Sequence, residues 1–265
     1  LLAPQVAISV ENARLYSEVA DREKRIEKDL EAARELQESM LPKRGPDIPG
    51  LEVAIGRRPA RIIGGDLYDF FELPDERALI ALGDVSGKGV AAALYGALIS
   101  GLLRTLAPRR REPAPLLKAL NDALIERKVD ARFVCALLLS WDPAARGFLI
   151  GNSGLPFPLI CRGSEVLQPR VAGVPPGLLP NSDYEQMAFQ TAPGDLVVLY
   201  SDGVTDQFNA AGEEYGRRRL RRLLKTVCPA PAQAVVEAIL ADLDRFAESA
   251  PVFDDQTLLV LRVKE

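Results

Sequence analysis

The sequence predicts an α+β protein whose sheets are mainly antiparallel. Helical and strand-like segments are mixed along the chain without the strict alternation of strand and helix that marks a doubly wound fold. Between residues 132 and 168, short apolar runs are separated by Gly, Pro, Asn and Asp, which is typical of antiparallel hairpins. The 265 residues are 48% hydrophobic and 26% charged, a composition that allows a large buried core.

The first 41 residues are expected to form a long helix, because they carry mixed charges and only one proline, Pro4. Apolar residues recur in a heptad pattern, and two polar residues interrupt the seam. The seam positions are Val19, Glu23, Ile26, Leu30, Ala33, Gln37 and Met40. We therefore expect a short, weak coiled coil and a homodimer through residues 15–40. A single amphipathic helix that lies on its own domain is the alternative.

The remaining elements follow a proline-rich boundary at Pro42, Pro46 and Pro49. Short apolar runs indicate strands, and longer Ala- and Leu-rich or amphipathic runs indicate helices. Strands are expected at 51–57, 67–73, 78–84, 132–141, 147–152, 158–161, 165–168, 195–200 and 258–263. Helices are expected at 90–103, 116–128, 217–226 and 230–249, with a Pro/Gly loop at 171–183.

Four carboxylates stand at the ends of predicted strands in distant parts of the chain: Asp66, Asp84, Asp202 and Asp254. For any one of them, a turn beside a glycine is the simpler interpretation. As a set they indicate a cluster, and like charges held together need cations. Hard divalent ions with oxygen ligands meet that need.

Several reaction classes are excluded by what the sequence lacks. It has no histidine, which excludes histidine phosphotransfer, Ser-His-Asp triads and His-rich metal sites. No cysteine is followed six residues later by arginine, so the cysteine-phosphatase loop is missing. A Walker loop fails at both ends, because Leu82 replaces its first glycine and Gly89 its Ser or Thr. The chemistry is therefore expected to rest on carboxylates.

The net charge of −4 gives no reason to expect nucleic acid or an anionic membrane as a partner. The longest uncharged apolar run, 89–103, is shorter than the ~20 residues that span a bilayer. Cys135, Cys161 and Cys228 are expected to be buried thiols in a reducing compartment, which predicts a cytoplasmic protein. Because the chain starts at Leu1, we expect it to be part of a longer protein.

Four motifs occur in a fixed order: Gly64–Asp69, Gly83–Gly89, Pro193–Asp195 with Tyr200–Asp206, and Asp254–Thr257. As a set they resemble the stage-II-sporulation-E-like branch of the bacterial type 2C (PPM) metal-dependent protein serine/threonine phosphatases. The resemblance covers residues 35–263. Residues 1–16 resemble the last helix of a GAF sensor domain, so we expect a sensor remnant at 1–16, a helical linker at 17–41 and a phosphatase domain at 42–265.

The resemblance implies an αββα sandwich that binds two Mg²⁺ or Mn²⁺ ions at one edge of its sheets. Asp84 would bridge both ions, Asp66 and the carbonyl of Val85 would complete one site, and Asp202 and Asp254 the other. A water activated by the two metals would then be the nucleophile. The implied substrate is a phosphorylated STAS-domain anti-sigma-factor antagonist in a partner-switching pathway. The alternative is a non-catalytic signalling module that keeps the fold and binds a partner.

Three further residues in these motifs are candidates for supporting roles. Asp69 is expected to support the metal ligands from behind, with a capping role as the alternative. Asp255 follows the metal-binding acid where other members often have Asn. Lys88 is a candidate for binding the substrate phosphate, and a solvated loop lysine is the alternative.

Overall fold

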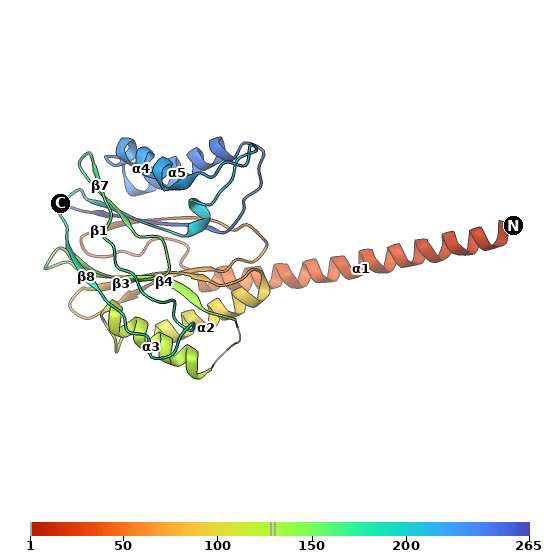
Figure 1. Cartoon of the computed structure of the whole chain (residues 1–265), viewed down its shortest axis with the longest axis horizontal. Helices are drawn as coiled ribbons and strands as arrows, with labels where there is room; N and C mark the ends of the chain where they lie inside the picture. Colours follow the sequence, from red (N-terminus) through yellow and green to blue (C-terminus); the bar gives the residue numbers. More distant parts are fainter. Residues whose placement is uncertain (1, 128, 130) are drawn as a thin grey trace.

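Two five-stranded antiparallel sheets face each other at the centre of the fold, and two helices cover the outer side of each (Figure 1). The computed structural model describes residues 2–127, 129 and 131–265. The predicted α+β class and the αββα sandwich are both confirmed.

Sheet I has the strand order β1-β10-β9-β6-β7. Its strands are β1 (Leu51–Arg58), β6 (Leu159–Arg162), β7 (Glu165–Leu167), β9 (Leu196–Tyr200) and β10 (Gln256–Val263). Helices α4 (Gly216–Val227) and α5 (Ala232–Ala247) pack on its outer face. Between β9 and α4, the short 3-10 helix η1 (Asp202–Val204) follows the strand directly.

Sheet II has the strand order β2-β3-β4-β5-β8. Its strands are β2 (Asp66–Glu72), β3 (Ala78–Val85), β4 (Val134–Asp142), β5 (Gly147–Ser153) and β8 (Met187–Gln190). Helices α2 (Val90–Leu106) and α3 (Pro113–Glu126) cover its outer face. The helix expected at 116–128 is α3, and residue 128 lies outside the described residues.

Side chains alternate between the two faces of each strand, and this produces three apolar layers. One lies between the two sheets, and one lies between each sheet and its covering helices. In β10, Leu258 and Val260 face α4 and α5, while Leu259 and Leu261 face sheet II. Each inner strand is therefore apolar on both faces, which is why β3, β4 and β10 appear as continuous hydrophobic runs in the sequence.

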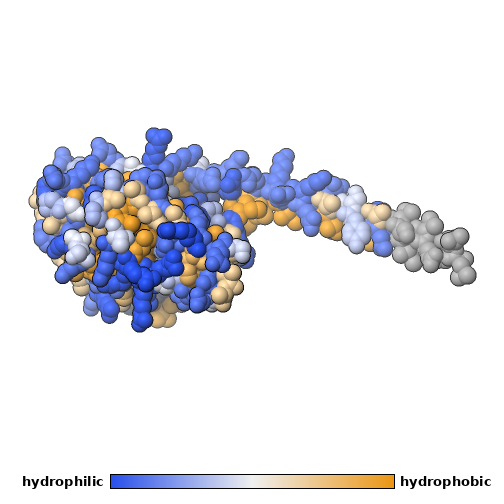
Figure 2. Space-filling model, turned by 90° about the horizontal axis from the view of Figure 1, so that it is seen from above, coloured by the Kyte–Doolittle hydropathy of each residue, from blue (hydrophilic) through white to orange (hydrophobic). Residues whose placement is uncertain are grey.

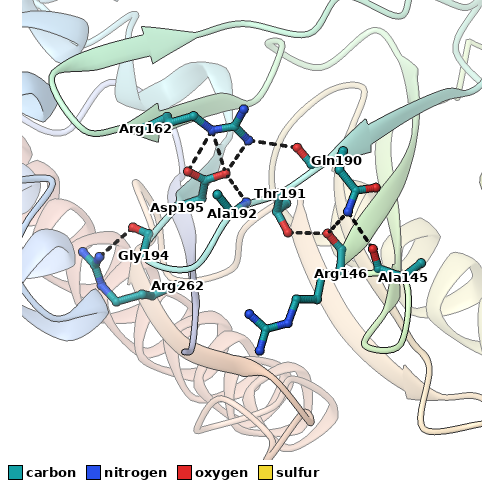
Figure 3. A network of polar contacts seen from close by, with 9 residues as sticks. All are labelled: Ala145, Arg146, Arg162, Gln190, Thr191, Ala192, Gly194, Asp195 and Arg262. Carbon is teal, nitrogen blue, oxygen red and sulfur yellow. Dashed lines mark hydrogen bonds and ion pairs between the residues drawn. The ribbon is translucent and has the colours of Figure 1, made fainter.

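A polar network ties the two sheets together at the end of β9 remote from Asp202 (Figure 3). Asp195, 1% exposed, accepts a hydrogen bond from Arg162 Nη2 at 2.6 Å. The same nitrogen donates to the carbonyl of Gln190 at 2.8 Å, so a side chain of β6 in sheet I bonds to β8 in sheet II. Asp195 belongs to one of the family-like motifs, and its contacts give it this structural role.

Helix α1 (Leu2–Met40) projects from the sandwich for most of its length (Figure 1). Residues 11–29 are exposed, with Val19 at 51% and Ile26 at 59%, and Figure 2 shows apolar side chains gathered along one side of the projecting helix. The alternative of a helix lying on its own domain is therefore wrong for this stretch. Within residues 11–40, the last turns are the part that touches the sandwich, where they meet α2.

Two sequence expectations need correction. Cys161 in β6 and Cys228 at the end of α4 form a disulfide, so they are not the free thiols expected, and the argument for a reducing compartment loses that support. Strand β8 was not expected at all, because Met187–Gln190 is short, largely exposed and follows a Pro/Gly loop. None of the described helices is long and apolar enough to cross a membrane.

Candidate metal centre

Two of the four acids face each other across neighbouring strands of sheet II. Asp66 opens β2 and pairs in register with Asp84 near the end of β3. Both share a strand face with side chains of the inter-sheet core, Tyr68 on β2 and Leu82 on β3, and so point toward sheet I. The strand alternation places their carboxylates together at one edge of the sandwich.

The other two acids come from the loops at the matching edge of sheet I. Asp202 begins η1 immediately after β9, and Asp254 lies two residues before β10. The antiparallel pairing of β9 with β10 brings these loops together, and Ser201 N donates to the carbonyl of Thr257 at 3.0 Å. All four predicted acids thus converge from both sheets.

Burial and the neighbouring carboxylates both raise the pKa of Asp66, Asp84 and Asp202. Burial, and after it the charge of Asp84, raises the pKa of Asp66 well above its usual range. Burial, followed by the charges of Asp202 and Asp254, raises the pKa of Asp84 to about 7. Burial and the neighbouring Asp206 and Asp254 also raise the pKa of Asp202. A divalent cation would relieve this repulsion.

The backbone beside Asp84 leaves room for a ligand because of one glycine. A Cβ on Gly65 would lie 3.1 Å from the carbonyl oxygen of Val85 and 3.5 Å from Asp84 Oδ1. The carbonyl expected to bind metal therefore points the same way as the carboxylate expected to bridge the ions. This donor set of hard oxygens fits Mg²⁺ or Mn²⁺.

Asp255 organises the loops around these acids. Its Oδ1 accepts from Ala60 N at 2.8 Å and its Oδ2 from Gly65 N at 2.6 Å. A Cβ on Gly64 would collide with the Asp255 carboxylate, and one on Gly203 with its carbonyl. The close approach of Asp255 therefore explains why glycine occupies positions 64 and 203. Both of its carboxylate oxygens accept hydrogen bonds from backbone N–H groups.

Asp69 lies away from the cluster. It is on the face of β2 opposite to Asp66, is 2% exposed and pairs with Arg104 of α2 at 2.8 Å. Burial raises its pKa. These contacts fasten α2 to sheet II, so the support for metal ligands that we expected from Asp69 is not what its geometry offers.

Lys88 forms an ion pair, although its side chain remains 40% exposed. Its Nζ lies 2.6 Å from Asp254 Oδ2 and 4.9 Å from the centre of the Phe253 ring. Asp66 is likewise engaged, because its Oδ2 accepts from Thr257 Oγ1 at 2.5 Å. With the acids in these contacts, no three His, Cys, Asp or Glu side chains in the described part of the chain stand in the geometry of a finished metal site.

Two residues near the acids were missed by sequence reasoning. Arg61 lines the same small cavity as Asp84, Lys88 and Asp254. Its position in the loop that leads into the first acid was the only signal for it. Gln37 of α1 exchanges two hydrogen bonds with the backbone of Gly64, at 2.7 and 3.2 Å. The heptad assigned it to a coiled-coil seam, but its side chain joins α1 to the segment that carries Asp66.

Residues 74–264 match the family model described as stage II sporulation protein E (SpoIIE). The matched stretch is well over half of the 265 residues. The chain belongs to the SpoIIE family. Two curated relatives are each 29% identical: Protein IcfG of Synechocystis sp., with 93% of this chain covered, and phosphoserine phosphatase RsbU of Bacillus subtilis, with 90% covered. The chain spans 43% of IcfG and 71% of RsbU.

Solved structures share the fold of this SpoIIE family member. The SiaA-PP2C domain of Pseudomonas aeruginosa superposes with a TM-score of 0.80 at 26% identity, covering 91% of this chain and 98% of that one. The catalytic domain of the serine/threonine phosphatase PstP, solved in complex with two manganese ions, gives a TM-score of 0.59 at 16% identity, covering 81% and 99%. The second likeness shows the fold alone.

Proposed function

We propose that this chain is a protein phosphatase that hydrolyses phosphoserine or phosphothreonine and depends on Mn²⁺ or Mg²⁺. The observation that carries the proposal is the convergence of four carboxylates from both sheets, with the Val85 carbonyl beside them, in a chain without histidine. The relative RsbU, named a phosphoserine phosphatase, and the manganese complex of PstP support both the reaction and the metals.

The residues would divide the metal binding as their positions suggest. Asp66, Asp84 and the Val85 carbonyl lie on sheet II and would hold one ion. Asp202 and Asp254 come from the loops of sheet I and would hold the other, with Asp84 shared between them. Bound there, the two cations would supply Lewis acidity that activates a water and offsets the charge of the phosphate.

The chain's own cations would orient the substrate. Arg61 is exposed at the rim of the cavity that contains Asp84, and its guanidinium can hold two phosphate oxygens at once. The described lining of this cavity has no histidine, cysteine, serine or threonine, and the proposal assigns its acids Asp84 and Asp254 to the metals. The reaction would then be a direct displacement by water.

We further propose that the substrate is a phosphorylated STAS-domain anti-sigma-factor antagonist, as the family resemblance implies, and that the chain acts in the cytoplasm. Residues 1–16 would be the end of a GAF-like sensor, 17–41 a linker that pairs two chains, and 42–265 the catalytic domain. The contact between Gln37 and Gly64 supports this division of labour, because it connects the linker helix to the Asp66 segment.

The first test is turnover of p-nitrophenyl phosphate with Mn²⁺, with Mg²⁺ and with a chelator, followed by release of phosphate from a phosphoserine protein. We expect turnover only with metal. The rival, a non-catalytic module that binds a partner, predicts no turnover under any of these conditions while a phosphoprotein still binds.

A further inference from the structure

Lys88 makes three contacts with one short segment of the neighbouring loop. Its Nζ forms an ion pair with Asp254 Oδ2 at 2.6 Å, donates to the carbonyl of Phe253 at 3.3 Å and lies over the Phe253 ring. Phe253 is 53% exposed, and its ring packs edge-on against Phe208, with centroids 5.2 Å apart. An ammonium held by an anion, a carbonyl and an aromatic face has a defined position.

The loop that carries Lys88 has a glycine on each side of it. Gly87 and Gly89 on either side have φ of 91° and 76°, which a residue with a side chain rarely adopts. Arg132 donates to the carbonyl of Ser86, and a Cβ on Gly87 would collide with its guanidinium. In this backbone conformation Lys88 lies against Asp254.

Asp254 has both of its carboxylate oxygens in use. Oδ1 accepts from the backbone N–H of Asp255 at 2.9 Å, and Oδ2 is held by Lys88. A carboxylate that binds a metal must present an oxygen to it, and the Lys88 ammonium already neutralises that oxygen. A cation at Asp254 has to displace Lys88 or tolerate its charge nearby.

We propose that Lys88 is a built-in counter-charge that competes with the metal for Asp254 and so sets the metal affinity of the sheet I half of the centre. The inference rests on the proposed function only in that Asp254 binds metal. In this proposal Lys88 is a positioning residue, because it acts on the metal through Asp254. Asp66 and Asp84, the carboxylates of the sheet II half, take part in none of the described ion pairs.

The test is calorimetric titration of the whole chain with Mn²⁺, comparing the parent with K88Q, K88R and R61Q. We expect K88Q to tighten the weaker Mn²⁺ dissociation constant about fivefold, which corresponds to about 1 kcal/mol, the scale of a partly exposed ion pair. K88R keeps the charge and should stay close to the parent. Arg61 lines the same cavity but forms none of the described ion pairs, so R61Q controls for loss of any nearby cation.

A second readout is the melting temperature, which does not depend on turnover. In chelator K88Q should melt slightly below the parent, because the ion pair is lost, and its rise on adding Mn²⁺ should be larger. The affinity gain should also shrink as NaCl is raised from about 0.05 to about 0.5 M.

The outcomes separate the two proposals. Equal or weaker Mn²⁺ binding by K88Q overturns the role of Lys88, as does an equal gain in R61Q. Binding of Mn²⁺ by K88Q but not by the parent supports it. If neither protein binds Mn²⁺, both the inference and the metal-dependent function fail. Metal binding that responds to Lys88 without any turnover would overturn the function alone.

Discussion

The two halves of the candidate metal centre are built differently. Asp66 and Asp84 lie on paired strands of sheet II, and their separation is fixed by the register of β2 and β3. Asp202 and Asp254 lie on loops at the edge of sheet I, more exposed, and Asp254 is held by a lysine. In a strand pair, the packing of the surrounding core keeps like charges close together. Residues on loops can change their conformation and move apart. The sheet II half should therefore be the more rigid and more strained of the two.

The largest effect expected is the loss of catalysis when either half is broken. D84A and D202A should each lower metal-dependent turnover by roughly a thousandfold or more, because each removes a carboxylate on which the cations depend. The fold should survive in both. In chelator, D84A should melt above the parent, since it removes a buried charge, whereas D202A should change the melting temperature little. Full activity in either variant would contradict the two-metal assignment.

The disulfide gives the next largest effect, and it belongs to sheet I alone. Cys161 and Cys228 join β6 to the end of α4 across a sequence separation of 67 residues. C228S should lower the free energy of unfolding by about 2–4 kcal/mol, as loss of a cross-link over a long loop does. Chemical denaturation with and without reductant measures this. C135S is the control, because Cys135 is free, and burial raises the pKa of its thiol to about 12. If reductant leaves the free energy of unfolding of the parent unchanged, Cys161 and Cys228 stay reduced.

A pH titration in chelator should isolate the contribution of Asp84 in the sheet II half. The pKa of Asp84 rises from 3.8 to about 7, mainly through burial, so between these values the folded protein binds more protons than the unfolded chain. Stability should therefore fall as the pH is raised from about 4 to about 7 and level off above that range. D84N should flatten this slope. A slope that is the same in the parent and D84N would show that other groups cause it.

The sequence alone predicted the parts of the molecule that depend on local pattern. The apolar runs located the inner strands, and the acids at the strand ends indicated the cluster in which Asp66 and Asp84 pair in register. It could not predict contacts set by tertiary distance. Nothing in the spacing of Cys161 and Cys228 shows that their sulfurs meet, and a loop lysine carries no sign that Asp254 lies 2.6 Å away.

Asp69 and Gln37 illustrate the opposite error, in which a pattern was applied too far. Asp69 lies close in sequence to Asp66, but an odd spacing of three residues in a strand sends it to the other face, toward Arg104. Gln37 falls on the heptad seam, but at this position α1 already contacts the sandwich. The Gln37 side chain therefore forms hydrogen bonds with the backbone of Gly64. For Asp69 the strand period, not its closeness in sequence to Asp66, decides the face; for Gln37 the heptad position is right, but the neighbouring element decides the contact.

The smallest effect expected concerns the projecting helix α1. Its exposed apolar stripe, including Val19 and Ile26, supports the predicted homodimer, with Glu23 on the seam keeping it weak. Because Gln37 is bonded to Gly64, changing it would disturb the metal centre as well, so Glu23 is the cleaner position. E23L should tighten the dimer about tenfold, since each chain gains a buried leucine on the seam.

The matched control is K28L, which adds the same side chain on the face opposite the seam. Light scattering between about 1 and 50 μM measures the dimer population over the range where weak coils pair. If the parent and E23L are both monomers throughout, the helix does not pair two chains. If K28L dimerises as well as E23L, added hydrophobicity rather than the heptad seam is responsible.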